Sequence, residues 1–169
     1  MAERVWWKKP MRVIQDNLQV MDTPKMDPEK IARETQEMHA DVLVINAGGI
    51  YAWYPSKVRY HHINEYLPKE YDLFGRLIEE CHKRNIRVVA RFDFSKTDDY
   101  VSQERPEWFV RNPDGTRRAY GQERPGNWSI LYLTCANSGY RNEEVAVPVL
   151  EEVIDNYPID GIFLNAPHY

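Results

Sequence analysis

The stretch IRVVARFDFSK, residues 86–96, has the composition of a buried strand until charged residues appear at two alternate positions, Arg91 and Asp93. Side chains alternate along a strand, so these two point to one side while Phe92 and Phe94 point to the other. A strand that begins as core and ends in charged groups is typical of the ligand-binding end of a parallel sheet. Two roles stay open for the charges: an ion pair that closes the top of the sheet, or a pair that contacts substrate.

Apolar runs and amphipathic segments alternate on both sides of this stretch. Asp27 can cap a helix whose first turn holds Pro28, and Pro148 is expected to bend or restart a later helix. Strands that are apolar on both faces and separated by helices predict an α/β fold with a parallel sheet, either doubly wound or part of a (β/α) barrel. The further predicted strands are 11–14, 41–49 and 160–165, and the predicted helices are 26–40, 70–85 and 140–157.

Length, composition and charge limit the classes of function. A chain of 169 residues that is 43% hydrophobic can bury one core, so one domain is expected. The net charge of −4, with both signs mixed, lacks the basic patch that nucleic acid or an anionic membrane requires. Because no apolar run approaches the roughly 20 residues that span a bilayer, we expect a cytoplasmic protein without membrane contact. Glycine motifs for dinucleotides or P-loop phosphates and metal-ligand spacings are missing, so no cofactor or metal is predicted.

Polar residues gather where the predicted strands end, and they form the candidate site. In parallel α/β folds the carboxyl ends of the strands hold the ligand, whereas the opposite ends serve stability. The residues concerned are Asp16, Asn46, Arg91, Asp93 and Asn165.

The connection from about residue 48 to 69 is long and rich in aromatic rings. Such rings suit sugars, whose C–H faces stack on them, although for most of these rings pinning the loop to the body is the better explanation, and only one or two are expected to reach ligand. We expect Tyr51 and Trp53 to reach ligand. Of the adjacent His61 and His62, at least one is expected to be structural, and His61 is the candidate hydrogen-bond partner of a substrate. Further on, residues 110–120 predict a small hairpin that turns at Asn112 to Gly115.

Several stretches together resemble the hypothetical glycosyl hydrolase 6 family of barrel-type glycosidases. They are NAGGIYAWYPS, LIEECHKRNIRVVARFDFSK, PEWFVRNPDG, CANSGY followed by a helix, and YPIDGIFLN, and they run through nearly the whole chain. The resemblance implies a (β/α) barrel that acts on glycosides, often with further domains similar to those of the family-42 β-galactosidases.

The chain contains about four predicted βα units, whereas a closed barrel of this type needs twice as many. We therefore expect residues 1–169 to form a single partial barrel domain, half of a TIM barrel truncated after the fourth strand. Its missing partner is either the carboxyl-terminal half of a longer protein or a second copy in a homo-oligomer.

Glycoside hydrolysis usually needs two carboxyl groups across the scissile bond. Related barrels commonly carry one at the end of the fourth strand, where this chain has Asn165 and Ala166. Asp93 and Asp16 are then the remaining catalytic candidates. Two functions stay open: a glycoside hydrolase whose 169-residue part alone is inactive, or a non-catalytic carbohydrate-binding or scaffold barrel. The predicted carbohydrate-binding residues are Asn46, Tyr51, Trp53, His61, Arg91, Asp93, Asn165 and His168.

Overall fold

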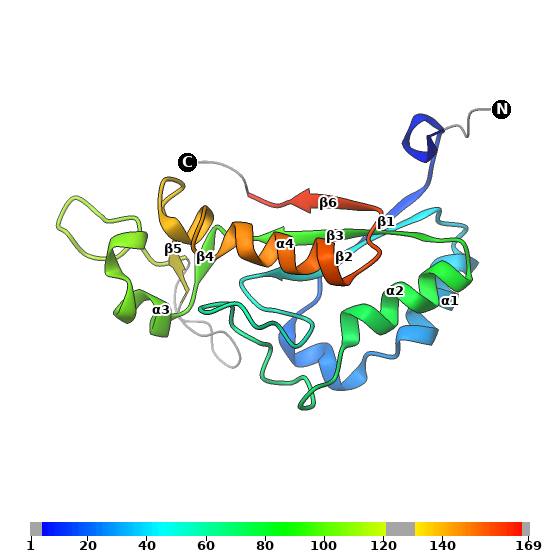
Figure 1. The fold of residues 1–169 in the computed structure, drawn as a ribbon, viewed down its shortest axis with the longest axis horizontal. Helices are drawn as coiled ribbons and strands as arrows, with labels where there is room; N and C mark the ends of the chain where they lie inside the picture. Colours follow the sequence, from blue (N-terminus) through cyan, green and yellow to red (C-terminus); the bar gives the residue numbers. More distant parts are fainter. Residues whose placement is uncertain (1–4, 121–130, 167–169) are drawn as a thin grey trace.

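A computed structural model describes residues 5–120 and 131–166, and its centre is a parallel sheet of four strands (Figure 1). The strand order is β1-β2-β3-β6, so each new strand is added at the same edge, as in a (β/α) barrel. All three strand pairs are parallel, which confirms the predicted α/β class. The strands span Val13–Asp16 (β1), Val42–Gly49 (β2), Arg87–Asp93 (β3) and Gly161–Leu164 (β6).

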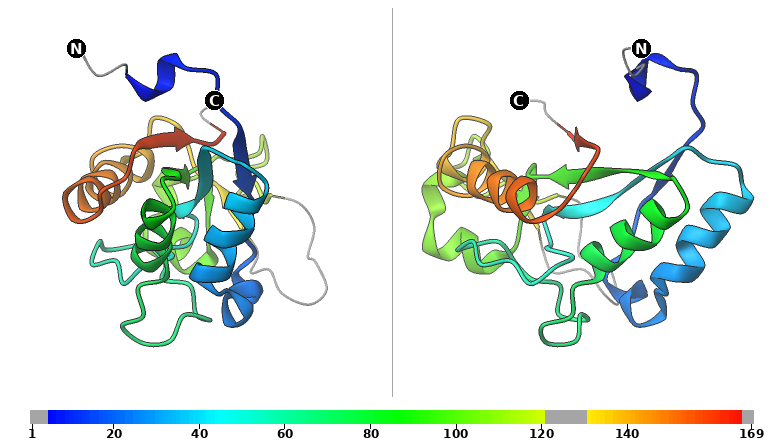
Figure 2. Two further views of the ribbon diagram at one scale, coloured as in Figure 1. Left: turned by 90° about the vertical axis from the view of Figure 1, so that its right-hand side faces the viewer. Right: turned by 45° about the vertical axis from the view of Figure 1, so that its right-hand side comes forward.

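Each crossover between neighbouring strands carries one long helix, and the three helices cover the same face of the sheet (Figures 1 and 2). Their apolar stripes point into a common core with β2 and β3. For the second helix, the residues at helical spacing are all buried: Leu73, Phe74, Leu77, Ile78 and Cys81. The helices are α1 (Pro28–Glu37), α2 (Leu73–Lys83) and α4 (Ala146–Asn156).

The first helix begins where its capping residue predicts, whereas the last helix begins later in the chain than its sequence predicts. The Asp27 carboxylate accepts hydrogen bonds from two backbone N–H groups in the first turn of α1, as the sequence predicts. The helix predicted over 140–157, bent or restarted at Pro148, is confirmed only in its second part. The chain first makes a 3-10 turn, η4 (Gly139–Arg141), and α4 then begins at Ala146. Pro148 therefore lies in the first turn of α4, where its missing N–H costs no helical hydrogen bond.

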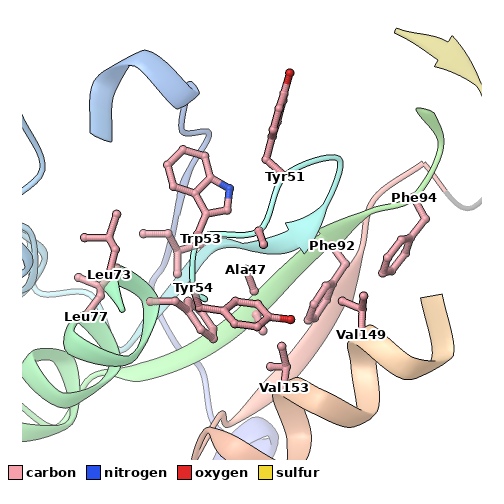
Figure 3. Packing of buried hydrophobic residues seen from close by; sticks show 14 of the residues in the cluster. Ala47, Tyr51, Trp53, Tyr54, Leu73, Leu77, Phe92, Phe94, Val149 and Val153 are labelled. Carbon is pink, nitrogen blue, oxygen red and sulfur yellow. The ribbon is translucent and has the colours of Figure 1, made fainter. Parts of the chain in front are cut away.

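The main core fills the space between the sheet and the helices (Figure 3). Side chains of β2 and β3 point toward Val149 and Val153 of α4 on one side and toward α2 on the other. Phe92 and Phe94 stack with their ring centroids 5.9 Å apart, so alternate residues of β3 face the helices as predicted.

The opposite face of the sheet carries none of these helices (Figure 2). Since Ala90 and Phe92 are buried against the helices, their neighbour Arg91 points to this open face. The register places Asn46 of β2 and Phe163 of β6 beside Arg91. In β2 the register shifts between Asn46 and Gly48, which marks a bulge at the carboxyl end of the strand.

The outer strands leave the sheet with open edges. Val13 of β1 and three consecutive residues of β6, Ile162 to Leu164, are exposed although they are large and apolar. An open parallel sheet whose last strand exposes apolar side chains on both faces has the geometry of a partial barrel. Within the described residues, no helix combines the length and the apolar character needed to cross a bilayer.

A smaller group of elements lies beyond the carboxyl end of β3 (Figure 1). The predicted hairpin is confirmed: Arg111 and Arg117 form an antiparallel bridge, and Gly115 takes a positive φ of 83° in the turn. Near the amino terminus the chain forms two 3-10 turns. The remaining elements are η1 (Trp6–Lys8), η2 (Val20–Lys25), β4 (Lys96–Thr97), α3 (Asp99–Glu104), η3 (Pro106–Trp108) and β5 (Tyr132–Leu133), with β4 and β5 paired antiparallel.

Candidate functional site

The carboxyl ends of β3 and β6 meet at Asp93. Its Oδ2 accepts hydrogen bonds from Asn165 Nδ2 at 2.9 Å and from Lys96 Nζ at 3.0 Å. Its Oδ1 accepts from the Ser95 backbone N–H at 2.9 Å and from the Ser95 hydroxyl at 2.5 Å. Asp93 and Lys96 are both buried. The structure thus brings two predicted site residues, Asp93 and Asn165, into direct contact around a fully occupied carboxylate.

The pKa of Asp93 lies below its ordinary value. Burial alone raises it, but the charge of Lys96 and the hydrogen bonds from Ser95 and Asn165 together outweigh burial. This carboxyl group stays ionised near neutral pH and has no proton to donate, so it is unsuited to act as a general acid.

The cation beside Asp93 is Lys96, so of the two roles left open for Arg91 and Asp93, the ion pair between them is not formed in the described part of the chain. Lys96 reaches Asp93 because the chain turns at Ser95, directly after the strand. Arg91 is instead turned sideways to β2, where its Nη1 donates to Asn46 Oδ1 at 3.0 Å. Asn46 and Arg91 therefore lie together on the open face, and Asn46 also donates to the Leu18 carbonyl at 3.3 Å.

Asp16 does not join the other strand-end residues. It is in register with Ile45, whose side chain is buried on the helix-covered face. Paired residues of neighbouring parallel strands point to the same face, so Asp16 lies on the face opposite to Asn46 and Arg91. Burial raises the pKa of its carboxyl group. The two catalytic candidates, Asp16 and Asp93, therefore point to opposite faces of the sheet and do not converge, because Asp16 is in register with Ile45 and Ala90 rather than with Arg91.

A pocket of about 260 Å³ lies at the carboxyl end of β3 and β6. The Arg141 guanidinium on its wall donates through Nε to Thr134 Oγ1 at 2.9 Å and is also close to the Ser95 carbonyl, at 3.3 Å. Burial lowers the pKa of Arg141 from its ordinary value, and it remains positively charged. The wall therefore combines apolar surface, amide and hydroxyl groups and a cation: Phe94, Ser95, Ala136, Arg141, Leu164, Asn165 and Ala166.

The aromatic residues predicted to bind ligand are mostly core. Trp53 is 3% exposed and packs in the main core near Leu73, so the prediction that it contacts substrate is wrong (Figure 3). Tyr51 is also buried, with its ring edge-on to the His62 ring at 5.1 Å between centroids. The rings anchor the connection between β2 and α2 because so long a segment needs apolar contacts to stay ordered.

His61 is structural, which corrects its assignment as a substrate donor. It is buried, its Nε2 accepts from the Gly49 backbone N–H at 3.1 Å, and its Nδ1 lies 2.9 Å from Ser56 Oγ. Both ring nitrogens are thus occupied inside the protein. Burial, with a smaller contribution from the charge of His62, lowers the pKa of His61 to about 3. The imidazole stays neutral and fixes the end of β2 against the loop.

His62 links the same loop to α3 through an ion pair. Its Nδ1 contacts Asp98 Oδ2, and its Nε2 lies 3.5 Å from Glu65 Oε2. The hydrogen bond to Asp98 raises the pKa of His62 above its ordinary value, despite opposing burial. The described residues contain no group of three His, Cys, Asp or Glu side chains arranged to hold a metal ion.

The raised pKa of His62 predicts a pH-dependent stability. The contribution of the His62 ion pair to the free energy of unfolding is fully present below the unfolded-state pKa of about 6.5, and it is lost as pH rises through the folded-state pKa. We expect His62→Gln to lower the free energy of unfolding by about 0.5 to 1 kcal/mol at mildly acidic pH, and by less in alkaline buffer. Urea unfolding at both pH values measures this. His39→Gln, at an exposed histidine, is the matched control, and an equal loss at both pH values contradicts the prediction.

Sequence reasoning missed three polar residues of the site: Ser95, Lys96 and Arg141. Ser95 and Lys96 come two and three residues after Asp93. A lysine so close behind a strand-end carboxylate could have indicated the ion pair. Arg141 comes from η4, far away in the chain, and only the fold brings it to the pocket. The predicted site residue His168 lies outside the described residues.

Comparison with known proteins places the chain in a family. A family model described as "Hypothetical glycosyl hydrolase 6" matches residues 27–166. No curated protein matches the chain significantly.

Several solved structures share the fold. An alpha-L-fucosidase isoenzyme 2 from Paenibacillus thiaminolyticus matches with a TM-score of 0.72 and 21% identity over 93% of this chain and 23% of that chain. A maltogenic alpha-amylase from Thermotoga neapolitana matches with a TM-score of 0.59 and 13% identity over 94% and 39%. An alpha-galactosidase from Thermus thermophilus, solved with stachyose, matches with a TM-score of 0.56 and 20% identity over 92% and 32%.

This chain thus spans less than two fifths of each of these three proteins, and at such identities the likeness shows the fold alone. The fold is that of part of a glycosidase (β/α) barrel. The family model covers most of the chain, which confirms the resemblance carried by the sequence motifs. The chain belongs to the hypothetical glycosyl hydrolase 6 family.

Proposed function

We propose that this chain supplies the carbohydrate-binding part of a glycoside-processing barrel. One observation carries the proposal: Asp93 and Asn165 form a fixed polar corner beside a pocket at the carboxyl end of β3 and β6. This is the end of a barrel at which ligands bind. Asn165 has the amide chemistry to hydrogen-bond a sugar hydroxyl, and Leu164 and Phe94 offer apolar surface to its C–H face.

The described residues supply binding groups rather than a catalytic pair. Retaining glycosidases place two carboxyl groups about 5 Å apart, and inverting ones somewhat further. Here the two strand-end carboxylates, Asp93 and Asp16, lie on opposite faces of the sheet, and β6 is followed by Asn165. Hydrolysis by the whole barrel then requires carboxylates outside the described residues. If the barrel has none, the protein is a carbohydrate-binding module, and the amide at the end of β6 favours that second function.

Ligand titration followed by NMR tests the proposal on the 169-residue chain. Suitable ligands are the methyl α-glycosides of L-fucose, D-galactose and D-glucose. These sugars are chosen because the solved structures that share the fold are a fucosidase, a galactosidase and an amylase. We expect saturable shifts at the pocket, and Asn165→Ala should weaken binding about tenfold, because one hydrogen bond to the sugar is lost. Asn156→Ala, at the exposed end of α4, is the control and should bind as the parent chain does.

Two results contradict the proposal. The first is the lack of saturable shifts with every glycoside, and the second is binding that Asn165→Ala leaves unchanged. A separate assay with aryl glycosides should give no turnover by this chain, since it lacks a catalytic pair among the described residues. Turnover by the parent chain that disappears in an Asp93→Asn variant shown by circular dichroism to be folded would mean that Asp93 takes part in catalysis and that the binding role is incomplete.

A further inference from the structure

Three side chains form a row across the open face of the sheet: Asn46 of β2, Arg91 of β3 and Phe163 of β6. The register places Asn46 and Phe163 directly beside Arg91 on its two sides. All three therefore point to the face that carries none of the three long helices. Phe163 is 39% exposed, so part of its ring is open to a ligand. This row lies one step along the strands from Asp93 and Asn165, roughly 6.6 Å away, so a single saccharide can touch both levels.

The positive charge of Arg91 has no counter-charge among the described residues. Within the described residues, its guanidinium makes one hydrogen bond, from Nη1 to the neutral Asn46 amide oxygen. The Nε atom is shielded from solvent and has no hydrogen-bond partner in the described structure. Asp93 does not compensate it, because that carboxylate is already paired with Lys96. The Nη groups keep further N–H donors beyond the one bond to Asn46, and such a half-buried guanidinium gains from an oxyanion at its Nη end, since charge-assisted hydrogen bonds are among the strongest in proteins.

The shape of the row indicates which oxyanion fits. The planar guanidinium fork matches a carboxylate through two parallel N–H···O bonds, and Arg suits this geometry better than Lys. The neighbouring Phe163 ring suits the C–H face of a pyranose, and Asn46 adds an amide beside the fork. We propose that this face binds an acidic sugar, a uronic acid, with its carboxylate on Arg91 and its ring against Phe163. The inference rests on the proposed carbohydrate-binding function and adds the class of sugar.

The test compares acidic and neutral sugars that differ only at one carbon. Methyl α-D-galacturonoside is titrated against the chain by NMR and compared with methyl α-D-galactoside, with sodium acetate as an ionic control. We expect the uronoside to bind about tenfold more tightly or better, a preference that shrinks as salt rises. Arg91→Gln should reduce the preference to within about twofold, whereas Arg91→Lys should keep part of it because the charge remains.

Controls separate charge, ring contact and folding. Arg76→Gln removes the same charge from the exposed surface of α2 and should leave the preference intact. Phe163→Ala should weaken both sugars by a similar factor. Equal binding of the acidic and the neutral sugar by the parent chain overturns the inference but leaves the proposed function standing. The partner of Arg91 would then be a carboxylate group of a protein rather than of a sugar. Binding of neither sugar overturns both. A salt-dependent preference in the parent chain, which needs no variant, keeps the test valid even if Arg91→Gln fails to fold.

Discussion

Gly49→Ala is expected to lower the free energy of unfolding by roughly 3 to 5 kcal/mol, the largest effect of any single change considered for this chain. Gly49 ends β2 with a φ of 102°, a backbone conformation that other residues rarely adopt. A Cβ atom added there would lie 2.3 Å from the Asp93 carbonyl oxygen and 2.5 Å from the Asp93 carbonyl carbon and nitrogen. The two backbones must separate to admit it, and the Asp93 corner moves with them.

The matched control for this change is Gly115→Ala. Gly115 also has a positive φ, of 83°, but nothing lies within 4 Å of an added Cβ atom. It therefore isolates the cost of the backbone conformation alone, about 1 kcal/mol. Urea unfolding of the parent chain and both variants measures the difference. Equal losses in the two variants would mean that close packing against Asp93 contributes nothing.

Asp93→Asn is expected to destabilise the fold by about 3 kcal/mol, because it leaves the buried ammonium of Lys96 without its carboxylate. This neutral substitution keeps the shape of the side chain but replaces one acceptor oxygen by an NH₂ donor, so two of the four hydrogen bonds that the carboxylate accepts are lost as well. The loss therefore combines the charge pair between Asp93 and Lys96 with these hydrogen bonds. The double variant Asp93→Asn with Lys96→Met should recover much of the loss, since it no longer buries an unpaired charge.

The same pair predicts how stability responds to acid. The pKa of Asp93 is lower in the folded than in the unfolded state, so its contribution is present above about pH 4 and is lost as pH falls further. The parent chain should therefore lose more stability than Asp93→Asn between neutral pH and pH 3. Parallel acid titrations of both proteins, followed by circular dichroism, measure this. Curves with the same slope would contradict a paired, ionised Asp93.

Local sequence features predicted the elements well. The apolar runs of β2 and β3, the Asp27 cap and the buried stripe of α2 all follow from backbone periodicity and capping, which involve only neighbouring residues. The extent of the last helix was misjudged at Pro148, because both a kink and a first-turn position agree with a proline at that point.

The site was predicted only in part, and the errors share one cause. Asp93 and Asn165 meet as expected since parallel strands end at the same edge. Trp53 and His61 are residue types that often bind ligands, but their loop folds back onto the core and buries them. The residue type determines which contacts a side chain can make, whereas its burial determines whether a ligand can reach it.

The sequence by itself determined the four strands of the main sheet, the helices α1 and α2, the parallel class and the family, because these depend on periodicity and on motifs that are read along the chain. Only the tertiary structure decided the partners of the charged groups: Lys96 rather than Arg91 at Asp93, the helix-covered face for Asp16, and the uncompensated charge of Arg91 on the open face. The physical reason is that partner choice depends on strand register and on turns such as the one at Ser95. A shift of one residue moves a side chain to the opposite face without changing the local pattern.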